Sequence, residues 1–283
     1  MLATLIIVFR EVLEAGLVIG IVMAASRGVA QRGVWVLGGC AIGVLGAFIV
    51  AGFAGEISSM VDGMGQELFN AAILLAAVGM LAWHNIWMSR HGRELAASAT
   101  RLGKDVIAGT RPLYALALVC GVALLREGSE VVLFLYGIAV SGGTTAGAMV
   151  LGGLIGGALG LAVGAALYFG LVFIPLRHLF RVTGGLILLL AAGMASQAAI
   201  FLAAANVVPT LGNEIWDSSG LLSERSLLGQ LLHILAGYTA RPAGIQLVFY
   251  LATLIIIGAG SYLTRRPPTV MTGTPAVAGQ GSS

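Results

Sequence analysis

Charged residues are scarce in this 283-residue chain, at 10% of the sequence against 58% for hydrophobic types. A soluble domain carries about 25% charged residues, so the composition excludes an ordinary soluble fold. The 42 glycines favour transmembrane helices that pack backbone against backbone. The chain is therefore expected to be an integral membrane protein.

The usual signatures of soluble chemistry are also missing. Cys40 and Cys120 each lie inside an apolar run, which indicates neither a disulfide framework nor a cysteine metal site. No Walker A motif, Rossmann fingerprint or nucleophile elbow is present. The basic residues form no patch, so the net charge of +3 does not indicate nucleic-acid binding. We expect no enzyme activity, no organic cofactor and no nucleic-acid partner.

Seven apolar segments are long enough to cross a hydrocarbon core of about 30 Å, which takes roughly 20 helical residues. They lie at 2–25, 34–54, 68–88, 113–138, 147–173, 182–204 and 243–263. The first carries three ionisable residues and lacks a basic leader, so we expect it to be retained as a span. The pattern predicts an all-α transmembrane domain over 1–264 and a disordered tail over 265–283.

Lysine and arginine mark one side of this membrane plan. They concentrate in the first, third and fifth connections and at the start of the tail. The only charged residues of the second connection are acidic, and the fourth connection has no charged residue. The positive-inside rule assigns the basic connections to the cytoplasm. The N-terminus is thus predicted outside and the C-terminus inside.

Glycine spacing indicates an internal repeat. Gly38-Gly39, Gly43 and Gly46 recur 114 residues later, and so do Ala77, Gly79 and Met80. Three-span units must cross the membrane in opposite senses, which is the inverted-repeat plan of many transporters. We expect repeat one over 1–111, repeat two over 112–204, an outer segment over 205–242 with an interfacial or re-entrant helix at 226–238, and a seventh helix over 243–263.

Two acidic motifs interrupt the apolar spans. Arg10, Glu11 and Glu14 lie in the first span, and Arg126, Glu127 and Glu130 lie in the fourth. Spacings of three and four residues bring each triplet to one helix face. One ionisable group at the bilayer centre costs roughly 2.5–3.5 kcal/mol, so a polar path or ion site is the first hypothesis.

The donor types at these motifs favour a hard cation. Carboxylate oxygens suit iron, manganese, magnesium or calcium better than Cu(I). Four glutamates and two arginines leave two negative charges if all are ionised, and a divalent cation would neutralise them. The alternative is a closed ion-pair network that joins the helices and binds no metal.

With these motifs the chain resembles the oxidase-dependent iron permeases, which include fungal high-affinity and bacterial EfeU-type permeases. The likeness rests on the two Arg-Glu-x-x-Glu motifs and extends over 83–87 and 217–238. It implies that Glu11, Glu14, Glu127 and Glu130 bind the transported iron, supported by Arg10 and Arg126. The family pattern is Arg-Glu-Gly-Leu-Glu, and this chain departs from it with Val12 and Ser129. Ser129 leaves open an added hydroxyl ligand or altered packing.

The resemblance implies an iron permease of the inner (plasma) membrane, surrounded by lipid. A separate extracytoplasmic oxidase or peroxidase and an iron-binding protein are the possible partners. The alternatives are a permease for lead or manganese and a metal-free, proton-conducting or structural subunit. Residues considered for ion access or release are His84, Glu56, Asp62, Glu214 and Asp217. His84 beside Trp83 and Trp87 is also typical of an anchor at the membrane interface.

Overall fold

The computed structural model is a bundle of helices, and the residues that it describes contain no strand. These residues are 1–59, 65–141, 144–170, 176–224 and 226–264, and side chains at 54–59, 88–93, 176–180 and several positions of α7 are not among the described ones. The helices are α1 (Leu2–Ala25), α2 (Arg32–Ser59), α3 (Gln66–Ile107), α4 (Tyr114–Ser141), α5 (Ala146–Tyr168), α6 (Leu176–Ala204), α7 (Leu227–Ala236) and α8 (Gly244–Thr264).

Five of these helices, α2, α3, α5, α6 and α8, contain a segment that is long and apolar enough to cross a membrane. The expected all-α, multi-pass membrane character is thus confirmed. Helices α1 and α4 have 24 and 28 residues, long enough for about 36 and 42 Å of helix. They differ from the other five in carrying three ionisable residues each within the apolar run, at 10, 11 and 14 and at 126, 127 and 130.

Helix α3 continues well beyond the predicted third span. The sequence pattern assigned 89–111 to a charged connection, whereas the helix has 42 residues and ends at Ile107. Its C-terminal part carries a buried apolar face, with Ala99, Leu102 and Val106 packed against Val22 of α1 and Leu116 of α4. Burial of this face holds the segment helical despite its charges, which periodicity over the membrane span could not reveal.

Close backbone packing joins α2 to α4. Gly39 and Gly43 of α2 are buried against the main chain of Ala117 and Gly121 of α4. A Cβ atom at either glycine would overlap the facing carbonyl oxygen, so only glycine permits this approach.

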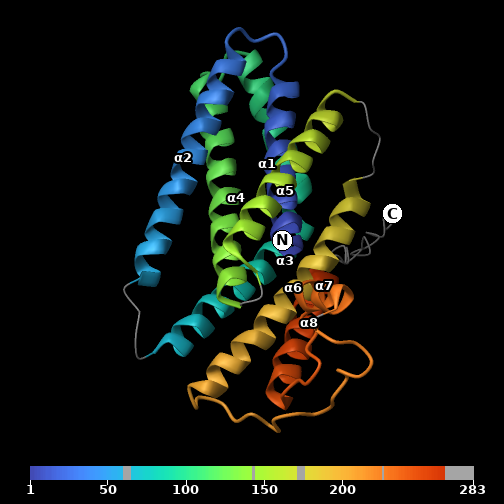
Figure 1. The fold of residues 1–283 in the computed structure, drawn as a ribbon. Helices are drawn as coiled ribbons and strands as arrows, with labels where there is room; N and C mark the ends of the chain where they lie inside the picture. The colour runs from blue at the N-terminus through green and yellow to red at the C-terminus, as the bar shows by residue number, and fades with distance from the viewer. Residues whose placement is uncertain (60–64, 142–143, 171–175, 225, 265–283) are drawn as a thin grey trace, which may run out of the picture.

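Helix α5 packs against α1 in the same manner. Gly152 and Gly156 of α5 are buried against the carbonyl groups of Met1 and Leu5. The 114-residue offset pairs Gly39 and Gly43 with Gly153 and Gly157. The glycines in close contact, Gly152 and Gly156, each lie one residue earlier. Each motif-bearing helix is therefore backed by a glycine-lined helix from the other half of the chain (Figure 1).

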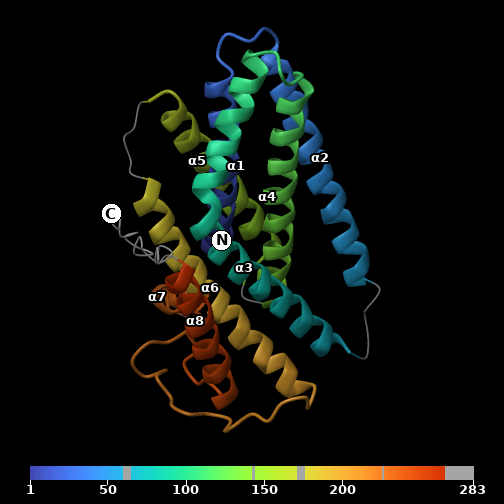
Figure 2. The same cartoon turned by 180° about the vertical axis from the view of Figure 1, so that it is seen from behind.

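The ends of the bundle differ in what closes them. Figure 2 shows the connection from α1 to α2 and the end of α3 at one end, and the segment between α6 and α8 at the other. Helix α7 lies within that segment, capped by Ser226 and ended by Gly237 at φ 66°, so the predicted short helix is confirmed. Between the ends lies an apolar core that includes Ile7, Phe134 and Ile187. The predicted disorder of 265–283 lies outside the described residues.

Candidate metal centre

The first acidic motif is almost completely buried on α1. Arg10, Glu11 and Glu14 expose 4%, 1% and 4% of their surfaces. Arg10 Nη1 lies 3.2 Å from Glu11 Oε1, and its Nε lies 2.8 Å from Glu14 Oε1. The four-residue spacing predicted that Arg10 and Glu14 share a face, and the structure pairs them. One guanidinium therefore orients both carboxylates of this copy.

The second motif, on α4, is arranged more loosely. Glu127 and Glu130 are buried, but the Arg126 side chain is 29% exposed. Arg126 Nε lies 3.1 Å from Glu130 Oε1 and 3.9 Å from Glu127 Oε1. The guanidinium also lies over the Trp87 ring, 4.4 Å from its centroid.

His84 of α3 joins the two motifs. Its Nε2 lies 3.1 Å from Glu14 Oε2, and its Nδ1 forms an ion pair with Glu130 Oε2. The ring is fully buried, so the interpretation of His84 as an interfacial anchor is wrong. The neighbouring Trp83, 60% exposed, has the outward position that the anchor interpretation requires. The two tryptophans gave a misleading signal, because successive helix residues face different directions.

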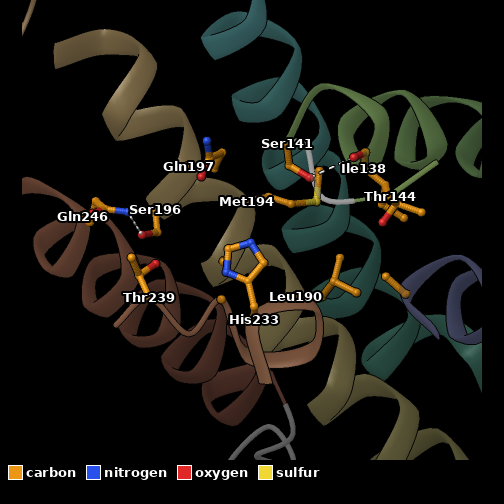
Figure 3. Close-up of a pocket in the computed structure, with 13 residues that line it drawn as sticks. Ile138, Ser141, Thr144, Leu190, Met194, Ser196, Gln197, His233, Thr239 and Gln246 are labelled. Atoms are coloured by element: carbon orange, nitrogen blue, oxygen red, sulfur yellow. Dashed lines mark hydrogen bonds between the residues drawn. The ribbon is translucent and has the colours of Figure 1, made fainter. Parts of the chain in front are cut away.

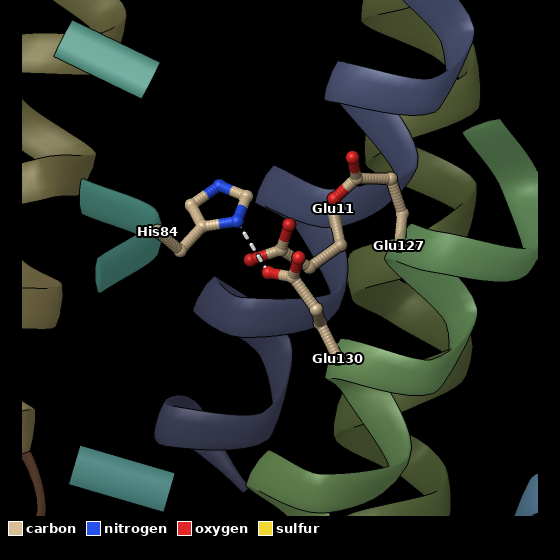
Figure 4. A group of neighbouring side chains, drawn as sticks. All are labelled: Glu11, His84, Glu127 and Glu130. Carbon is tan, nitrogen blue, oxygen red and sulfur yellow. Dashed lines mark ion pairs between the residues drawn. The ribbon is translucent and has the colours of Figure 1, made fainter. Parts of the chain in front are cut away.

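Four side chains form a compact group of possible metal ligands, Glu11, His84, Glu127 and Glu130 (Figure 4). One donor atom from each lies within 4.8 Å of the others. Glu14 reaches this group through His84 and is not a member of it. The set thus replaces one predicted glutamate with a histidine.

The group has unused acceptor capacity. The Oε2 atoms of Glu11 and Glu127 are buried and have no hydrogen-bond donor among the described residues. Burial of an unpaired carboxylate oxygen is costly, and a cation or proton between these oxygens would remove that cost. Three carboxylates and one imidazole are donors that suit iron and manganese. The arrangement is chemically able to take a dehydrated divalent or trivalent cation.

A cavity of about 600 Å³ reaches the second motif from one end of the bundle. Glu127 and Arg126 line it together with Ser98, Arg101 and Asp105 of α3. Its remaining lining is largely apolar and comes from α1, α3 and α4, with Arg111 beyond the end of α3. The cavity therefore extends from Glu127 to the end of the molecule at which α3 terminates.

The acidic residues expected at the outer mouth do not join the group. Arg241 Nη2 lies 3.0 Å from Asp217 Oδ2, and Nη1 lies 3.9 Å from Glu214 Oε1. Hydrogen bonds from Ser219, followed by Arg241, lower the pKa of Asp217 to about 2. The pair partly neutralises the carboxylates that were expected to gather cations. The side chain of Glu56 and all of Asp62 lie outside the described residues.

Ser129 is directed to its own helix. Its hydroxyl donates a 2.7 Å hydrogen bond to the carbonyl oxygen of Leu125. No described contact joins it to the ligand group, and such a back-bond satisfies the hydroxyl within the turn. This geometry favours the packing interpretation of Ser129.

Comparison with known proteins identifies related sequences and the family of the chain. The sequence is 29% identical over 260 residues to a "Ferrous iron permease EfeU" of Yersinia pestis, covering 90% of this chain and 91% of the relative. A protein of the same name from Escherichia coli O6:H1 (strain CFT073) is 30% identical over 260 residues, with 90% and 93% covered. No solved structure matches. The profile of the iron permease FTR1 family matches residues 1–265. The chain therefore belongs to the iron permease FTR1 family, as its two acidic motifs suggested.

Proposed function

We propose that the protein imports iron across the cytoplasmic membrane through a site at the membrane midplane. Glu11, Glu127, Glu130 and His84 bind the ion, and Glu14 holds the imidazole in place. The observation that carries this proposal is the convergence of both motifs and His84, with one donor atom of each ligand within 4.8 Å of the others. The family match and the names of the relatives, ferrous iron permeases, support iron as the cargo.

The chemistry of the group suits a transported cation better than a permanent one. The arginines keep the empty carboxylates oriented, because each is bonded to a glutamate of its own helix. Binding of a divalent ion would neutralise the two excess negative charges of the glutamates and arginines. Transport requires binding strong enough to strip water from the ion and weak enough to release it. The paired arginines weaken the site's net attraction for a cation and so favour release.

In this proposal helices α1 and α4 also cross the membrane, so that they and the five apolar helices make seven spans. Their charged side chains meet at the centre of the bundle and do not face lipid. Ionisable residues within membrane spans generally face the bundle interior in this way. The exchange of partners, α2 with α4 and α5 with α1, is the packing expected for two inverted repeats. A repeat of this kind places the cargo site at its midplane.

The direction of transport follows from loop charge and from the cavity. The positive-inside rule places the end of α3 in the cytoplasm, and the 600 Å³ cavity leads from Glu127 to that end. The membrane potential favours inward movement of a cation by about 2.3 kcal/mol per charge per 100 mV. An extracytoplasmic oxidase or peroxidase is the proposed partner that supplies the ion, as in the family that the motifs resemble.

Removal of one ligand tests the site. Glu11→Gln or Glu127→Gln keeps the side-chain shape but loses a charge, and uptake of radioactive iron into cells should fall at least about tenfold. Glu94→Gln, at an exposed position on α3, is the matched control and should transport normally. Membrane insertion is checked by size-exclusion chromatography of a fluorescent fusion. Normal uptake by either site variant would contradict the proposal.

The choice of cargo is tested in the same cells. Unlabelled manganese or lead in tenfold excess should compete weakly if iron is the cargo, and strongly if either is the true substrate. A metal-free role would instead leave purified protein without any carboxylate-dependent iron binding. Uptake measured separately with Fe2+ and with Fe3+ distinguishes the oxidation state that is carried.

A further inference from the structure

A second, more polar cavity of about 50 Å³ lies at the start of α1 and the end of α4 (Figure 3). The large cavity lies instead at the end of α3 and the start of α4. A water molecule needs about 10–15 Å³ of such space, so the cavity has room for roughly three water-sized groups. Polar side chains from α4, α6, α8 and the segments beside them line it: Ser141, Thr144, Ser196, Gln197, Thr239 and Gln246. His233 of α7 lines it too, together with apolar groups such as Leu190 and Met194, and the lining has no carboxylate among the described residues.

A hydrogen bond to the main chain fixes the orientation of the His233 ring. Its Nδ1 lies 2.6 Å from the carbonyl oxygen of Tyr238. A carbonyl oxygen can only accept, so Nδ1 carries the proton, and in the neutral imidazole Nε2 holds the lone pair. Gly237, in the left-handed conformation at φ 66°, ends α7 and turns the chain so that Tyr238 offers this oxygen. A histidine whose Nδ1–H donates to a backbone carbonyl has the arrangement of a metal ligand.

An apolar layer separates this cavity from the carboxylate group. Ala3 and Ile138 line the cavity, whereas Glu11 and Glu130 lie two turns further along the same helices. Ile7 lies midway between Ala3 and Glu11 on α1, and Phe134 lies midway between Glu130 and Ile138 on α4. Both Ile7 and Phe134 are fully buried in the apolar core. Eight residues of helix correspond to about 12 Å. The two sites are thus successive positions along one axis, with a closed apolar layer between them.

We propose that the outer cavity is a second cation site, in which His233 binds iron through Nε2 before the ion reaches the carboxylates. This inference rests on the proposed function, since it gives the imported ion its first dehydrated position. Hydroxyl and amide oxygens of the lining replace part of the hydration shell. Without a carboxylate the site holds the ion weakly, which suits a position that the ion must leave. The imidazole selects iron over magnesium and calcium, which prefer oxygen donors.

Two substitutions separate ligation from structure. Asparagine at this position places an amide N–H near the place of Nδ1, so His233→Asn keeps a donor for the Tyr238 carbonyl and removes Nε2. The KM for iron uptake should rise at least about tenfold, with the maximal rate kept. His233→Gln keeps a polar group near the place of Nε2 and should be affected less. A KM of His233→Asn equal to that of the wild-type protein would overturn the proposal.

Direct binding distinguishes this proposal from the function on which it rests. Fe2+ binding to the purified, full-length protein is measured by anaerobic equilibrium dialysis. Glu11→Gln combined with Glu127→Gln should retain weak binding that reaches one ion per chain at saturating Fe2+, and adding His233→Asn should abolish it. Loss of all binding in the Glu11/Glu127 double variant, or no effect of His233→Asn within it, overturns the outer site alone. Normal iron uptake by the double variant would instead overturn the carboxylate site.

Discussion

The two copies of the acidic motif have the same sequence order but different surroundings. Arg10 is 5% exposed in its side chain and lies within 3.2 Å of both its glutamates, whereas Arg126 is 29% exposed and approaches Glu127 only to 3.9 Å. The second copy also lines the cavity that extends to the end of α3. The first copy is therefore the fixed, enclosed wall of the group, and the second is its open side.

Substitution of the two arginines should give the largest contrast. Arg10→Met leaves Glu11 and Glu14 buried without their partner, which should lower the free energy of unfolding by about 3–5 kcal/mol. Arg126→Met should cost less, because the Arg126 guanidinium is 29% exposed and lies farther from Glu127. Denaturant unfolding of the purified variants in detergent measures both. Equal losses would remove the distinction between a fixed and an open copy.

Substitution of the glycines that pack against the two motif-bearing helices should give the next largest loss of stability. Gly43→Ala should disturb α4 and Gly156→Ala should disturb α1, each by about 1–3 kcal/mol, because the added Cβ meets a backbone carbonyl. Gly38→Ala and Gly153→Ala are the matched controls. A Cβ at Gly38 has nothing within 4 Å, and one at Gly153 has only a 3.9 Å contact. Thermal unfolding should separate the two classes, and similar melting temperatures for all four would contradict the packing.

Trp87 contacts the arginine of the second copy. Trp87→Leu should remove about 0.5–1 kcal/mol of stability through the lost contact of its ring with Arg126. The effect should shrink in an Arg126→Met background, which a double-mutant cycle of unfolding free energies measures. An undiminished effect would assign the loss to apolar packing of the indole instead.

Ser129→Ala should have the smallest effect, within about 0.5 kcal/mol, since the hydroxyl bonds only its own helix among the described residues. Iron uptake should keep its KM. A raised KM would instead restore Ser129 as a hydroxyl ligand and bring the second copy's departure from the family pattern into the site.

Much of the site was predictable because helix periodicity is local. The three- and four-residue spacings of Arg10, Glu11 and Glu14 define a shared face without any tertiary information. Composition likewise predicts the membrane, and two such motifs at intramembrane positions predict their meeting. The family follows from the same residues.

His84 could not be assigned in this way, because its role depends on how deep α3 lies in the membrane. The helix extends to Ile107, so the end of the apolar run does not mark the end of the helix or of its buried face. The pairing of Asp217 with Arg241 was hidden for a related reason. The two residues lie on either side of α7 in segments without regular secondary structure, so no local periodicity predicts their contact. Contacts between segments distant in sequence are set by tertiary packing.

The glycine contacts have a consequence for divergence within the family. Where main-chain atoms touch across a helix pair, the separation of the helices is set by backbone thickness and is independent of the remaining side chains. Residues on the lipid-facing sides of α2 and α5 can then be exchanged without displacing a carboxylate. An identity of 29–30% to the relatives leaves ample room for exchanges of this kind.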